Sequence, residues 1–592
     1  MLDRQAFLGV VHSATARRWV GPDAGIERMG LAIAQAADVP EIVGRILAAR
    51  DVAPEDAADY LAPTLRGLMP DPSSLADMDA AADRLAHAAL HGERVAIFGD
   101  YDVDGASAAA MLFDWLASFG IEARLHIPDR MTEGYGPNIP AMQRLGAEHD
   151  LVICVDCGTV AHEPVAAARA AGADVIIADH HLPGETLPDA LAVVNPNRAD
   201  CPSGLGQLCA AGVVFLILVA ANRVLRAGGK TGPDLLSALD LVAVATVADV
   251  APLTGLNRAF VRQGLCVMAG RQRPGLAALA DVAGLRAPPR SSDLGFVLGP
   301  RLNAGGRVGD AALAVRLLTT REPAAAARIA GEIEAMNLAR RQVESEVLES
   351  AIAQAEMRLA AEENPVLAWA VGEGWHPGVV GIVASRLKER FGCPAVVIGV
   401  EDGLGRGSGR SVPGVDLGSA VSALAREGLL VKGGGHRMAA GLTVEAAGAA
   451  AAMMALEARL AVQGAAPAEP NTLVIDALLS PAGATPELVT MLEAAGPFGQ
   501  SAPPPRVALG TVTPSGLRVS DRGHASLRLA APGGGPQLSA IAFGAAESGL
   551  AALLDAAASA RRPLHVAGRL EIDDWGGRRR AKLRLEDAAE PA

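Results

Sequence analysis

Cysteine and aromatic residues are scarce in this chain. The first scarcity excludes a disulfide-rich domain, and the second argues against an extensive base-stacking surface. Six cysteines among 592 residues cannot frame a disulfide-rich secreted domain. Aromatic side chains are only 3% of the chain, so a surface that stacks on bases has few members to draw on. A zinc site is also disfavoured, because Cys154 and Cys157 flank a carboxylate at a predicted strand end, where alternation sends the two thiols to different sides.

Segments typical of secreted or membrane proteins are missing as well. The start, Met1 to Gln5, has neither the basic head nor the apolar stretch of a signal peptide. The longest strongly apolar run, Cys209 to Ala221, is shorter than the roughly 18 residues that a membrane span needs. We interpret this run as a buried helix and expect a soluble, cytoplasmic protein.

An excess of positive charge is also absent, since the formal net charge is −14. A negative total argues at first against a nucleic-acid partner, but the distribution of charge matters more than its sum. Basic residues cluster at Arg340-Arg341, at Arg406 and Arg410, and over residues 578–584. Each cluster is either a solvated face or part of a nucleic-acid-binding surface.

The most informative feature present is acidic. Residues 98–105 read Phe-Gly-Asp-Tyr-Asp-Val-Asp-Gly and follow an apolar run. If the segment is extended, the alternate residues Asp100, Asp102 and Asp104 point the same way, with a helix beginning at Gly105. Three like charges so close resist ionisation unless a cation shares the site. The pattern therefore predicts a divalent-metal site, with a solvated acidic turn that caps a helix as the alternative.

Three further apolar runs deliver side chains of the same kind. They are 151–155 before Asp156, 173–178 before Asp179, His180 and His181, and 241–248 before Asp249. We expect all four segments to end at the rim of one sheet, where open α/β sheets bind their ligands. Carboxylates mixed with imidazoles suit manganese or magnesium. Two such ions about 3.5–4 Å apart can activate water and stabilise a leaving oxygen, which is a phosphoester hydrolase in outline.

These motifs resemble those of the DHH phosphoesterase superfamily, and the later ones resemble its RecJ family of single-strand-specific exonucleases. The superfamily motifs are Phe98–Gly105, Asp156-Cys-Gly158, Asp179-His-His181 and Thr246–Leu253. The later motifs are Arg301–Arg307, Gly374–Gly381, Gly407–Ser411 and Gly433–His436. The resemblance runs from about residue 60 to the C-terminus with the motifs in the family's order. One departure is Ser501-Ala502, where the family has Gly-Asn before a proline.

The resemblance implies a role for each site residue. Two manganese or magnesium ions would be held by Asp102, Asp104, Asp156, His180 and Asp249. Asp156 would bridge them, Asp100 would be a further ligand or a base, and His181 would donate to the phosphate or steer the leaving group. The expected phosphate-binding residues are Arg301, Asn303, Arg307, His376, Arg410, Ser411, Gly434, Gly435 and His436.

The pattern of apolar runs predicts an α/β protein. A chain of 592 residues should form several domains, because single cores rarely exceed roughly 250–300 residues. The expected parts are an N-terminal segment (1–75), a parallel-sheet DHH domain (76–320), a connecting helix (321–364), a smaller α/β DHH-associated domain (365–462) and a β-barrel (471–592). The connecting segment has one apolar helix face. In the smaller domain, glycine-rich turns at 403–409 and 433–435 would let backbone amides approach a phosphate.

The C-terminal part carries five short strand-like runs separated by turns, which favours a small barrel. The runs are 473–479, 506–511, 526–529, 538–543 and 564–572. The resemblance implies an OB-fold, a fold that binds single strands through a basic groove and aromatic stacking. Trp575, beside the arginine run, either stacks on a base or packs against the barrel.

The resemblance implies a 5′→3′ exonuclease that releases mononucleotides from single-stranded DNA in recombination, repair and mismatch repair. It also implies work beside a RecQ-type helicase and the single-stranded-DNA-binding protein, and we expect a monomer. One alternative is a phosphodiesterase for short oligonucleotides or cyclic dinucleotides, which the barrel disfavours. The other is an inactive replication scaffold, which has no use for so many mutually repulsive carboxylates.

Overall fold

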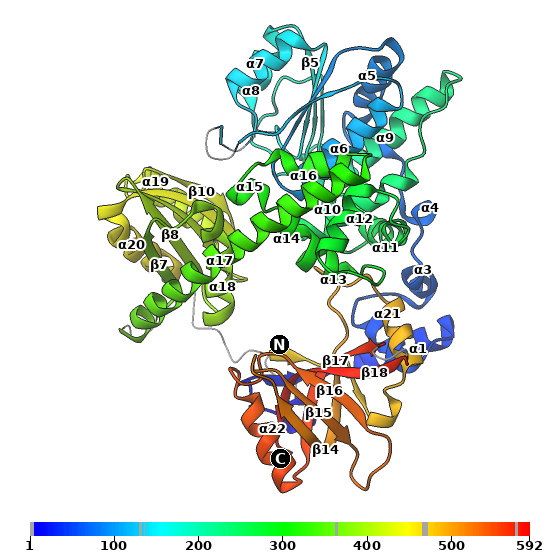
Figure 1. The fold of residues 1–592 in the computed structure, drawn as a ribbon, viewed down its shortest axis with the longest axis vertical. Helices are drawn as coiled ribbons and strands as arrows, with labels where there is room; N and C mark the ends of the chain where they lie inside the picture. Colours follow the sequence, from blue (N-terminus) through cyan, green and yellow to red (C-terminus); the bar gives the residue numbers. More distant parts are fainter. Residues whose placement is uncertain are drawn as a thin grey trace.

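The chain folds into three lobes built on separate β-sheets, shown as a computed structural model in Figure 1. The structure describes residues 5–129, 133–134, 136–361, 365–464, 472–574 and 578–591. A parallel-sheet lobe is followed by a smaller α/β lobe, drawn in olive and yellow, and then by a β-barrel in orange and red. This arrangement confirms the predicted fold class.

The first lobe is centred on a sheet in which every pair of strands is parallel. Its order is β3 (Arg124–His126), β2 (Val95–Gly99), β4 (Leu151–Val155), β5 (Asp174–Ala178) and β6 (Ala192–Val194). Continuous apolar runs are typical of strands buried on both faces, and the successive residues Ile97 and Phe98 of β2 belong to different cores. One layer is α5 (Met78–His91), α6 (Val103–Ala117) and α9 (Ala210–Ala227), and the other is α7 (Ile139–Glu148) and α8 (His162–Ala170).

Helix α9 contains the long apolar run noted in the sequence. Among the described residues it is the one helix whose length and composition would allow it to cross a membrane. However, 67% of its residues are buried inside the protein, where they pack in the largest hydrophobic core. We therefore interpret α9 as the buried core helix that the sequence predicts.

The apolar run before Asp249 is a helix, so the expectation that four such segments end at the sheet rim is wrong for this one. Residues 241–245 of α10 (Leu239–Ala248) are buried on every side, and such a run lacks the periodicity that separates a helix from a strand. The other helices of this lobe are α11 (Leu256–Ala269), α12 (Pro274–Val282), α13 (Ser291–Asp293), α14 (Gly299–Leu302), α15 (Gly305–Val308) and α16 (Ala312–Thr319), with a π-helical turn at Leu294–Leu298.

A 39-residue helix, α17 (Pro323–Ala361), connects the first lobe to the second, as the sequence predicts. The second lobe has a mixed sheet in the order β10 (Lys432–His436), β11 (Ala439–Glu445), β9 (Leu404–Arg410), β8 (Ala395–Glu401) and β7 (Ala368–Glu373). Its helices are α18 (Pro377–Phe391), α19 (Leu417–Arg426) and α20 (Ala449–Val462).

Both glycine-rich segments of this lobe form strands, so their prediction as turns is wrong. They are β9 and β10, which pair antiparallel with β11 on its two sides. In β9, a Cβ atom at Gly405, Gly407 or Gly409 would lie 2.7–2.8 Å from a side chain of the core. These glycines permit close packing in a sheet rather than a change of chain direction.

The third lobe is a closed five-stranded barrel, and it confirms the predicted barrel. The strands run in the order β14 (Val507–Val519), β15 (Ala525–Ala530), β16 (Leu538–Ala542), β18 (Arg580–Ala589) and β17 (Leu564–Asp573), and β17 pairs again with β14. Helix α22 (Leu550–Ala560) stands between β16 and β17 in the chain, and α21 (Pro486–Ala494) precedes the barrel.

Two strand predictions fail in this lobe. The run 473–479 divides into β12 (Thr472–Val474) and β13 (Ala477–Leu479), which pair in different sheets. Strand β18 is missing from the prediction because its segment was interpreted only as a basic cluster. Its alternate residues Leu583 and Leu585 are buried in the barrel core, while the cations Arg580, Lys582 and Arg584 occupy the positions that alternate with them.

The first seventy residues, which the sequence leaves without a role, lie against two lobes. Residues 18–48 pack against the barrel lobe, whereas residues 60–68 contact the first lobe, where Arg258 of α11 donates to the Tyr60 carbonyl oxygen. Strand β1 (Arg18–Val20) pairs in parallel with β12, and the buried Trp19 Nε1 donates to Asp587 Oδ2 at 2.8 Å. The helices of this segment are α1 (Ala24–Ala37), α2 (Glu41–Ala48), α3 (Ala57–Leu61) and α4 (Leu65–Leu68). Figure 1 shows this dark blue segment beside the orange and red strands. The two ends of the chain therefore share one lobe.

Candidate metal centre

Four segments of the first lobe bring acidic and imidazole side chains to one place. Asp100, Asp156 and Asp179 each follow the last residue of a parallel strand, β2, β4 and β5 respectively. Asp249 is the C-cap residue of α10. Carboxyl ends of parallel strands meet at one edge of a sheet, which is why residues so far apart in the chain converge.

The first acidic motif is not extended as expected. Helix α6 begins at Val103, and Asp102 is its N-cap, accepting hydrogen bonds from the backbone N–H groups of Asp104 (2.9 Å) and Gly105 (3.1 Å). Gly105 is required here, because a Cβ atom would lie 2.6 Å from the Asp100 carbonyl oxygen. Asp104 therefore lies in the first turn of α6 and belongs to a different group of side chains from Asp100 and Asp102.

The buried Asp104 carboxylate is held by the start of another helix. It accepts hydrogen bonds from the backbone N–H groups of Ala210 (2.6 Å) and Ala211 (2.8 Å), the first residues of α9. A helix N-terminus offers free N–H donors and a favourable dipole to a negative charge. Asp104 is thus fixed in place by the apolar core helix of the lobe.

The side chains form three overlapping groups whose potential ligand atoms lie within 4.8 Å of one another. The groups are Asp100, Asp102 and Asp156; Asp104, His180 and Asp249; and Asp156, His180 and His181. Asp156 and His180 each belong to two groups. The predicted metal residues thus lie together, and the three aspartates of the first motif divide between two groups instead of sharing one.

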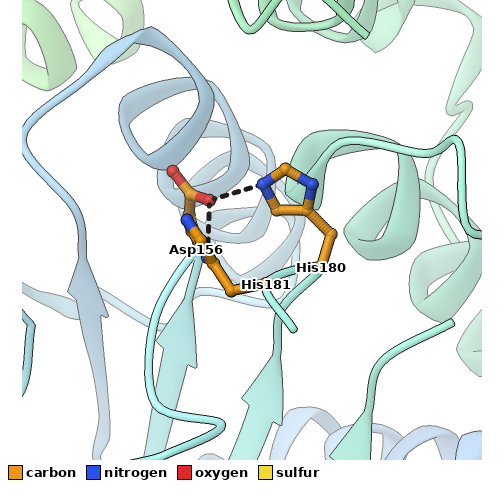
Figure 2. A group of neighbouring side chains, drawn as sticks. All are labelled: Asp156, His180 and His181. Carbon is orange, nitrogen blue, oxygen red and sulfur yellow. Dashed lines mark ion pairs between the residues drawn. The ribbon is translucent and has the colours of Figure 1, made fainter. Parts of the chain in front are cut away.

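Asp156 stands at the centre of these groups. Its Oδ1 atom lies 3.3 Å from His180 Nε2 and 3.9 Å from His181 Nδ1, as Figure 2 shows. This oxygen is buried and accepts no hydrogen bond from any residue that the structure describes. The backbone of Asp156 has φ +60°, a left-handed conformation that is costly for a residue with a side chain and concentrates at functional sites.

Burial and mutual repulsion make the ionised carboxylates unfavourable without a cation. Burial first, and the neighbouring aspartates next, raise the pKa of Asp104 and hold the pKa of Asp156 well above its usual range. The same causes raise the pKa of Asp249 to about 8. A buried oxygen without a donor, carboxylates of raised pKa and imidazoles together fit a hard divalent ion such as Mn²⁺ or Mg²⁺.

Asp179 orients the two histidines. Its Oδ1 accepts from the backbone N–H groups of His180 and His181 and lies 2.7 Å from His181 Nδ1. Burial alone would lower the pKa of His181, but the hydrogen bond and charge of Asp179 outweigh burial and raise it to about 9. Asn195 also supports this corner, donating from Nδ2 to the His181 carbonyl oxygen and to Thr159 Oγ1.

The three residues predicted to bind phosphate near the metals are engaged with the protein itself. Asn303 Oδ1 accepts from the backbone N–H of Val103 at the start of α6. Arg301 forms an ion pair with Glu334 of α17 at 2.5 Å. Arg307 donates from Nη1 to the Gly378 carbonyl oxygen of the second lobe. The Asn303 contact reaches the first acidic motif, whereas Arg301 contacts α17 and Arg307 contacts the second lobe. The phosphate-binding role of all three stays a prediction.

Comparison with known proteins shows the family. Three domain families match, described as "DHH family, N-terminal domain" (residues 94–246), "DHHA1 domain" (363–461) and "RecJ OB domain" (475–587). The single-stranded-DNA-specific exonuclease RecJ of Salmonella typhimurium is 35% identical over 570 residues, which cover 93% of this chain and 96% of that protein. The Thermus thermophilus RecJ is 34% identical over 82% of this chain and 70% of its own length. This chain belongs to the RecJ family.

Solved RecJ structures agree with the fold. The crystal structure of Thermus thermophilus RecJ in complex with Mn²⁺ superimposes with a TM-score of 0.79 at 29% identity, covering 97% of this chain and 80% of that one. The structure of the same RecJ in complex with Mg²⁺ gives a TM-score of 0.71 at 27% identity over 97% of this chain and 78% of that one. The metals in these two complexes are the two that the donor set of this RecJ-family chain fits.

In the second lobe of this RecJ-family protein, the predicted Ser411 is part of the framework. It is buried, and its hydroxyl donates to the Val415 carbonyl oxygen at 2.9 Å. The sequence reasoning missed Ser408, whose Oγ accepts from Arg410 Nη1 at 2.9 Å. Gly381 of α18 leaves room for this pair, because a Cβ atom there would lie 3.1 Å from Ser408 Oγ and 3.2 Å from Arg410 Nη2.

The other predicted residues of this lobe have mixed surroundings. His376 is the N-cap of α18, and its Nδ1 accepts from the Gly378 N–H. Gly434, Gly435 and His436 lie in β10, where His436 is exposed. Gly435 cannot be replaced easily, since a Cβ atom would lie 2.3 Å from the Ala439 carbonyl oxygen. The prediction for Trp575 falls outside the described residues.

Proposed function

We propose that this chain is a Mn²⁺- or Mg²⁺-dependent exonuclease that hydrolyses phosphodiester bonds of single-stranded DNA in the 5′→3′ direction and releases mononucleotides. The observation that carries the proposal is the grouping of carboxylates and imidazoles around the buried Asp156. Its Oδ1 accepts no hydrogen bond from any residue that the structure describes. Membership of the RecJ family supports the substrate class.

The residues of the metal centre have separate roles in binding the ions. Asp102, Asp104, Asp156, His180 and Asp249 would hold two ions, and Asp156 would be shared because it belongs to two of the groups, with Asp100 as a further candidate ligand. When bound, the two ions supply activation of water and stabilisation of the charge on phosphate. Asp104 is kept in place by the start of α9, and Asp102 by its capping contacts, so the ligands are positioned before the ions arrive.

His181 is the proton-carrying residue of the site. With its pKa raised to about 9 by Asp179, the ring is protonated at neutral pH and donates a hydrogen bond to a non-bridging phosphate oxygen or the leaving group. Asp100 is the candidate base or further ligand on the opposite group. Asn303 holds the start of α6 beside the metal centre, and Arg301, Asn303 and Arg307 would bind phosphates near the metals.

A terminal phosphate fits the second lobe. Arg410 keeps its guanidinium against Ser408, and Gly434, Gly435, His436 and His376 complete the proposed binding surface. A terminal-phosphate site in the second lobe, together with the metal centre of the first lobe, would account for the release of mononucleotides. The barrel, with Arg580, Lys582 and Arg584 on β18, holds the strand further along through its phosphates.

Family membership also supports the cellular setting of this proposal. The enzyme acts in the cytoplasm as a monomer, in recombination, repair and mismatch repair, beside a RecQ-type helicase and the single-stranded-DNA-binding protein. A dinucleotide phosphodiesterase is disfavoured because a dinucleotide needs no barrel lobe. An inactive scaffold is disfavoured because the buried carboxylates of raised pKa destabilise a protein that binds no ion.

Digestion of a long single strand, labelled at either end, tests the proposal in Mn²⁺. The wild type is compared with Asp156→Ala and with Asp555→Asn, a matched loss of charge on the exposed face of α22. We expect labelled mononucleotides early from the 5′ end, none with Asp156→Ala, and normal digestion with Asp555→Asn. Binding without cleavage by the wild type would support the scaffold, and cleavage of dinucleotides alone would support the small-substrate phosphodiesterase.

A further inference from the structure

The loop between α21 and β14 contacts the catalytic lobe at the segment that follows Asp249. The Leu253 backbone N–H donates to the Gln500 carbonyl oxygen at 2.9 Å. Gly499 lies directly over the Leu253 side chain, since a Cβ atom at residue 499 would be 2.7 Å from Leu253 Cδ1. Ala502, from the same loop, is 1% exposed and belongs to the hydrophobic core of the catalytic lobe.

The loop is itself held in a fixed shape. Gly499 and Ala502 exchange backbone hydrogen bonds of 2.9 and 3.1 Å across its tip. The Phe498 carbonyl oxygen accepts from Ser291 Oγ at 2.7 Å. At the base of the loop, the buried Arg258 of α11 donates to the carbonyl oxygens of Gly496 (2.8 Å) and Ala495 (3.2 Å). The loop is therefore anchored to the catalytic lobe at several points.

The catalytic segment that receives the loop is strained. Val250, directly after Asp249, has φ +58°, which is a rare conformation for a β-branched residue. Its side chain is 63% exposed, so no packing of its own holds this conformation. The chain reverses here, with the Ala251 N–H bonded to the Thr246 carbonyl oxygen, and reaches the loop two residues later. Strain of this kind persists only where the surroundings fix it.

We propose that the Pro497–Pro503 loop is a positioning element for Asp249. By fixing Leu253, the loop stabilises the strained turn at Val250 and so holds the Asp249 carboxylate in its group with Asp104 and His180. The loop leads directly into β14, the first strand of the barrel, so this contact connects the C-terminal part of the chain to the metal centre of the catalytic lobe. The inference rests on the proposed role of Asp249 as a metal ligand.

Replacement of Gly499 by valine tests this role, because its branched side chain displaces Leu253. The control is Gly448→Val, at a glycine with φ −92° where an added Cβ atom would have no other atom within 4 Å. Mn²⁺ binding is measured by titration calorimetry, a readout that does not depend on cleavage. We expect Gly499→Val to weaken Mn²⁺ binding about tenfold, as a displaced ligand would, and Gly448→Val to leave it unchanged.

A compensating variant separates positioning from general damage. Leu253→Val removes the Cδ1 atom that the new side chain meets, so Gly499→Val with Leu253→Val regains most of the Mn²⁺ affinity. At saturating Mn²⁺, the KM for single-stranded DNA stays within about twofold of the wild type because the DNA contacts are elsewhere. If valine prevents folding, Gly499→Ala gives the same test with a smaller intrusion.

Unchanged Mn²⁺ affinity in a folded Gly499→Val protein would overturn the inference, as would a loss of affinity that Leu253→Val does not reverse. Failure of the proposed function is recognised separately. In that case the wild type binds Mn²⁺ in the calorimeter and does not degrade single-stranded DNA.

Discussion

Two buried acidic clusters in the catalytic lobe differ in what neutralises them. At the metal centre, Asp104, Asp156 and Asp249 have ion-pair contacts with histidines only, among the residues that the structure describes. At the other end of α10, Asp240 is as buried as Asp104 and Asp156, yet Arg273 donates to it from Nε at 2.9 Å and to Asp114 from Nη1 at 3.0 Å.

This difference distinguishes a buried carboxylate that stabilises the fold from one that serves the metal centre. Burial raises the pKa of Asp240 just as it does at the metal centre, but the charge and hydrogen bond of Arg273 oppose that rise. Asp156 has no such guanidinium, and its neighbouring aspartates add to the rise. A buried carboxylate with an internal cation stabilises the fold, whereas a group of them without one requires a cation from solution.

The largest effect is expected at the carboxylate without an internal partner. Asp156→Asn should lower kcat on single-stranded DNA by more than ~100-fold, since even residues behind a metal ligand cost 10–100-fold. It should also raise the melting temperature of the metal-free protein, because a repulsive buried charge is removed. Nuclease assays and thermal melts in EDTA measure the two effects. A variant as active as the wild type would contradict the assignment.

The opposite result is expected at the internally paired cluster. Arg273→Met leaves Asp240 buried without its cation and should destabilise the protein by about 3 kcal/mol in urea. The Mn²⁺ concentration for half-maximal activity should not change. The double variant Arg273→Met with Asp240→Asn should regain part of the stability, and equal losses in the single and double variants would refute the pairing.

The pH dependence of the metal-free protein should distinguish the clusters further. Because the pKa of Asp249 is raised to about 8 from 3.8, the fold keeps a proton that the unfolded chain has lost. Stability in EDTA should therefore fall as pH rises from about 4 to 8, by at most ~1.4 kcal/mol per pH unit for one proton. Denaturant melts across this range test the slope. With saturating Mn²⁺ the slope should flatten, and a flat curve in EDTA would contradict the account.

The smallest effects are expected at Ser408 and Ser411 of the second lobe. Ser408→Ala should raise the KM for single-stranded DNA about fivefold through loss of one hydrogen bond at the Arg410 site. Ser411→Ala should leave KM unchanged and lower stability by about 1–2 kcal/mol, because the Val415 carbonyl oxygen loses its donor. Steady-state kinetics and urea melts on both variants measure these effects. A raised KM in Ser411→Ala and an unchanged KM in Ser408→Ala would instead support phosphate binding by Ser411.

The metal residues were predictable because their signal is local. Asp156 and His180 follow short apolar runs, and the rule that parallel strands end at one edge brings them together. Asp104 was predicted near them, but its grouping with His180 and Asp249 was not. Helix α6 begins at Val103, two residues before the predicted start, because Asp102 caps it and Gly105 packs closely on Asp100. Ser408 was missed because a glycine-rich run does not look like a strand. Once β9 is known, residues 408 and 410 share a face.

The barrel was predicted, but the pairing of the two chain ends in its lobe was not. Strand β1 finds its partner β12 more than 450 residues away, and nothing near Trp19 indicates Asp587. Strand β18 shows the same limit, since its cations alternate with the two buried leucines that mark it as a strand and hide their pattern. Non-local pairing and close glycine packing are properties of the folded chain, and short-range patterns do not contain them.

The most direct test of the central claim is the anomalous scattering of manganese in crystals of the wild-type protein. The account predicts two manganese peaks about 3.5–4 Å apart, with Asp156 between them, one beside Asp102 and the other beside Asp104, His180 and Asp249. Crystals of Asp156→Asn should lose at least one peak. No peak at these residues, or manganese bound only elsewhere on the surface, would contradict the claim that this acidic group is a two-metal nuclease centre.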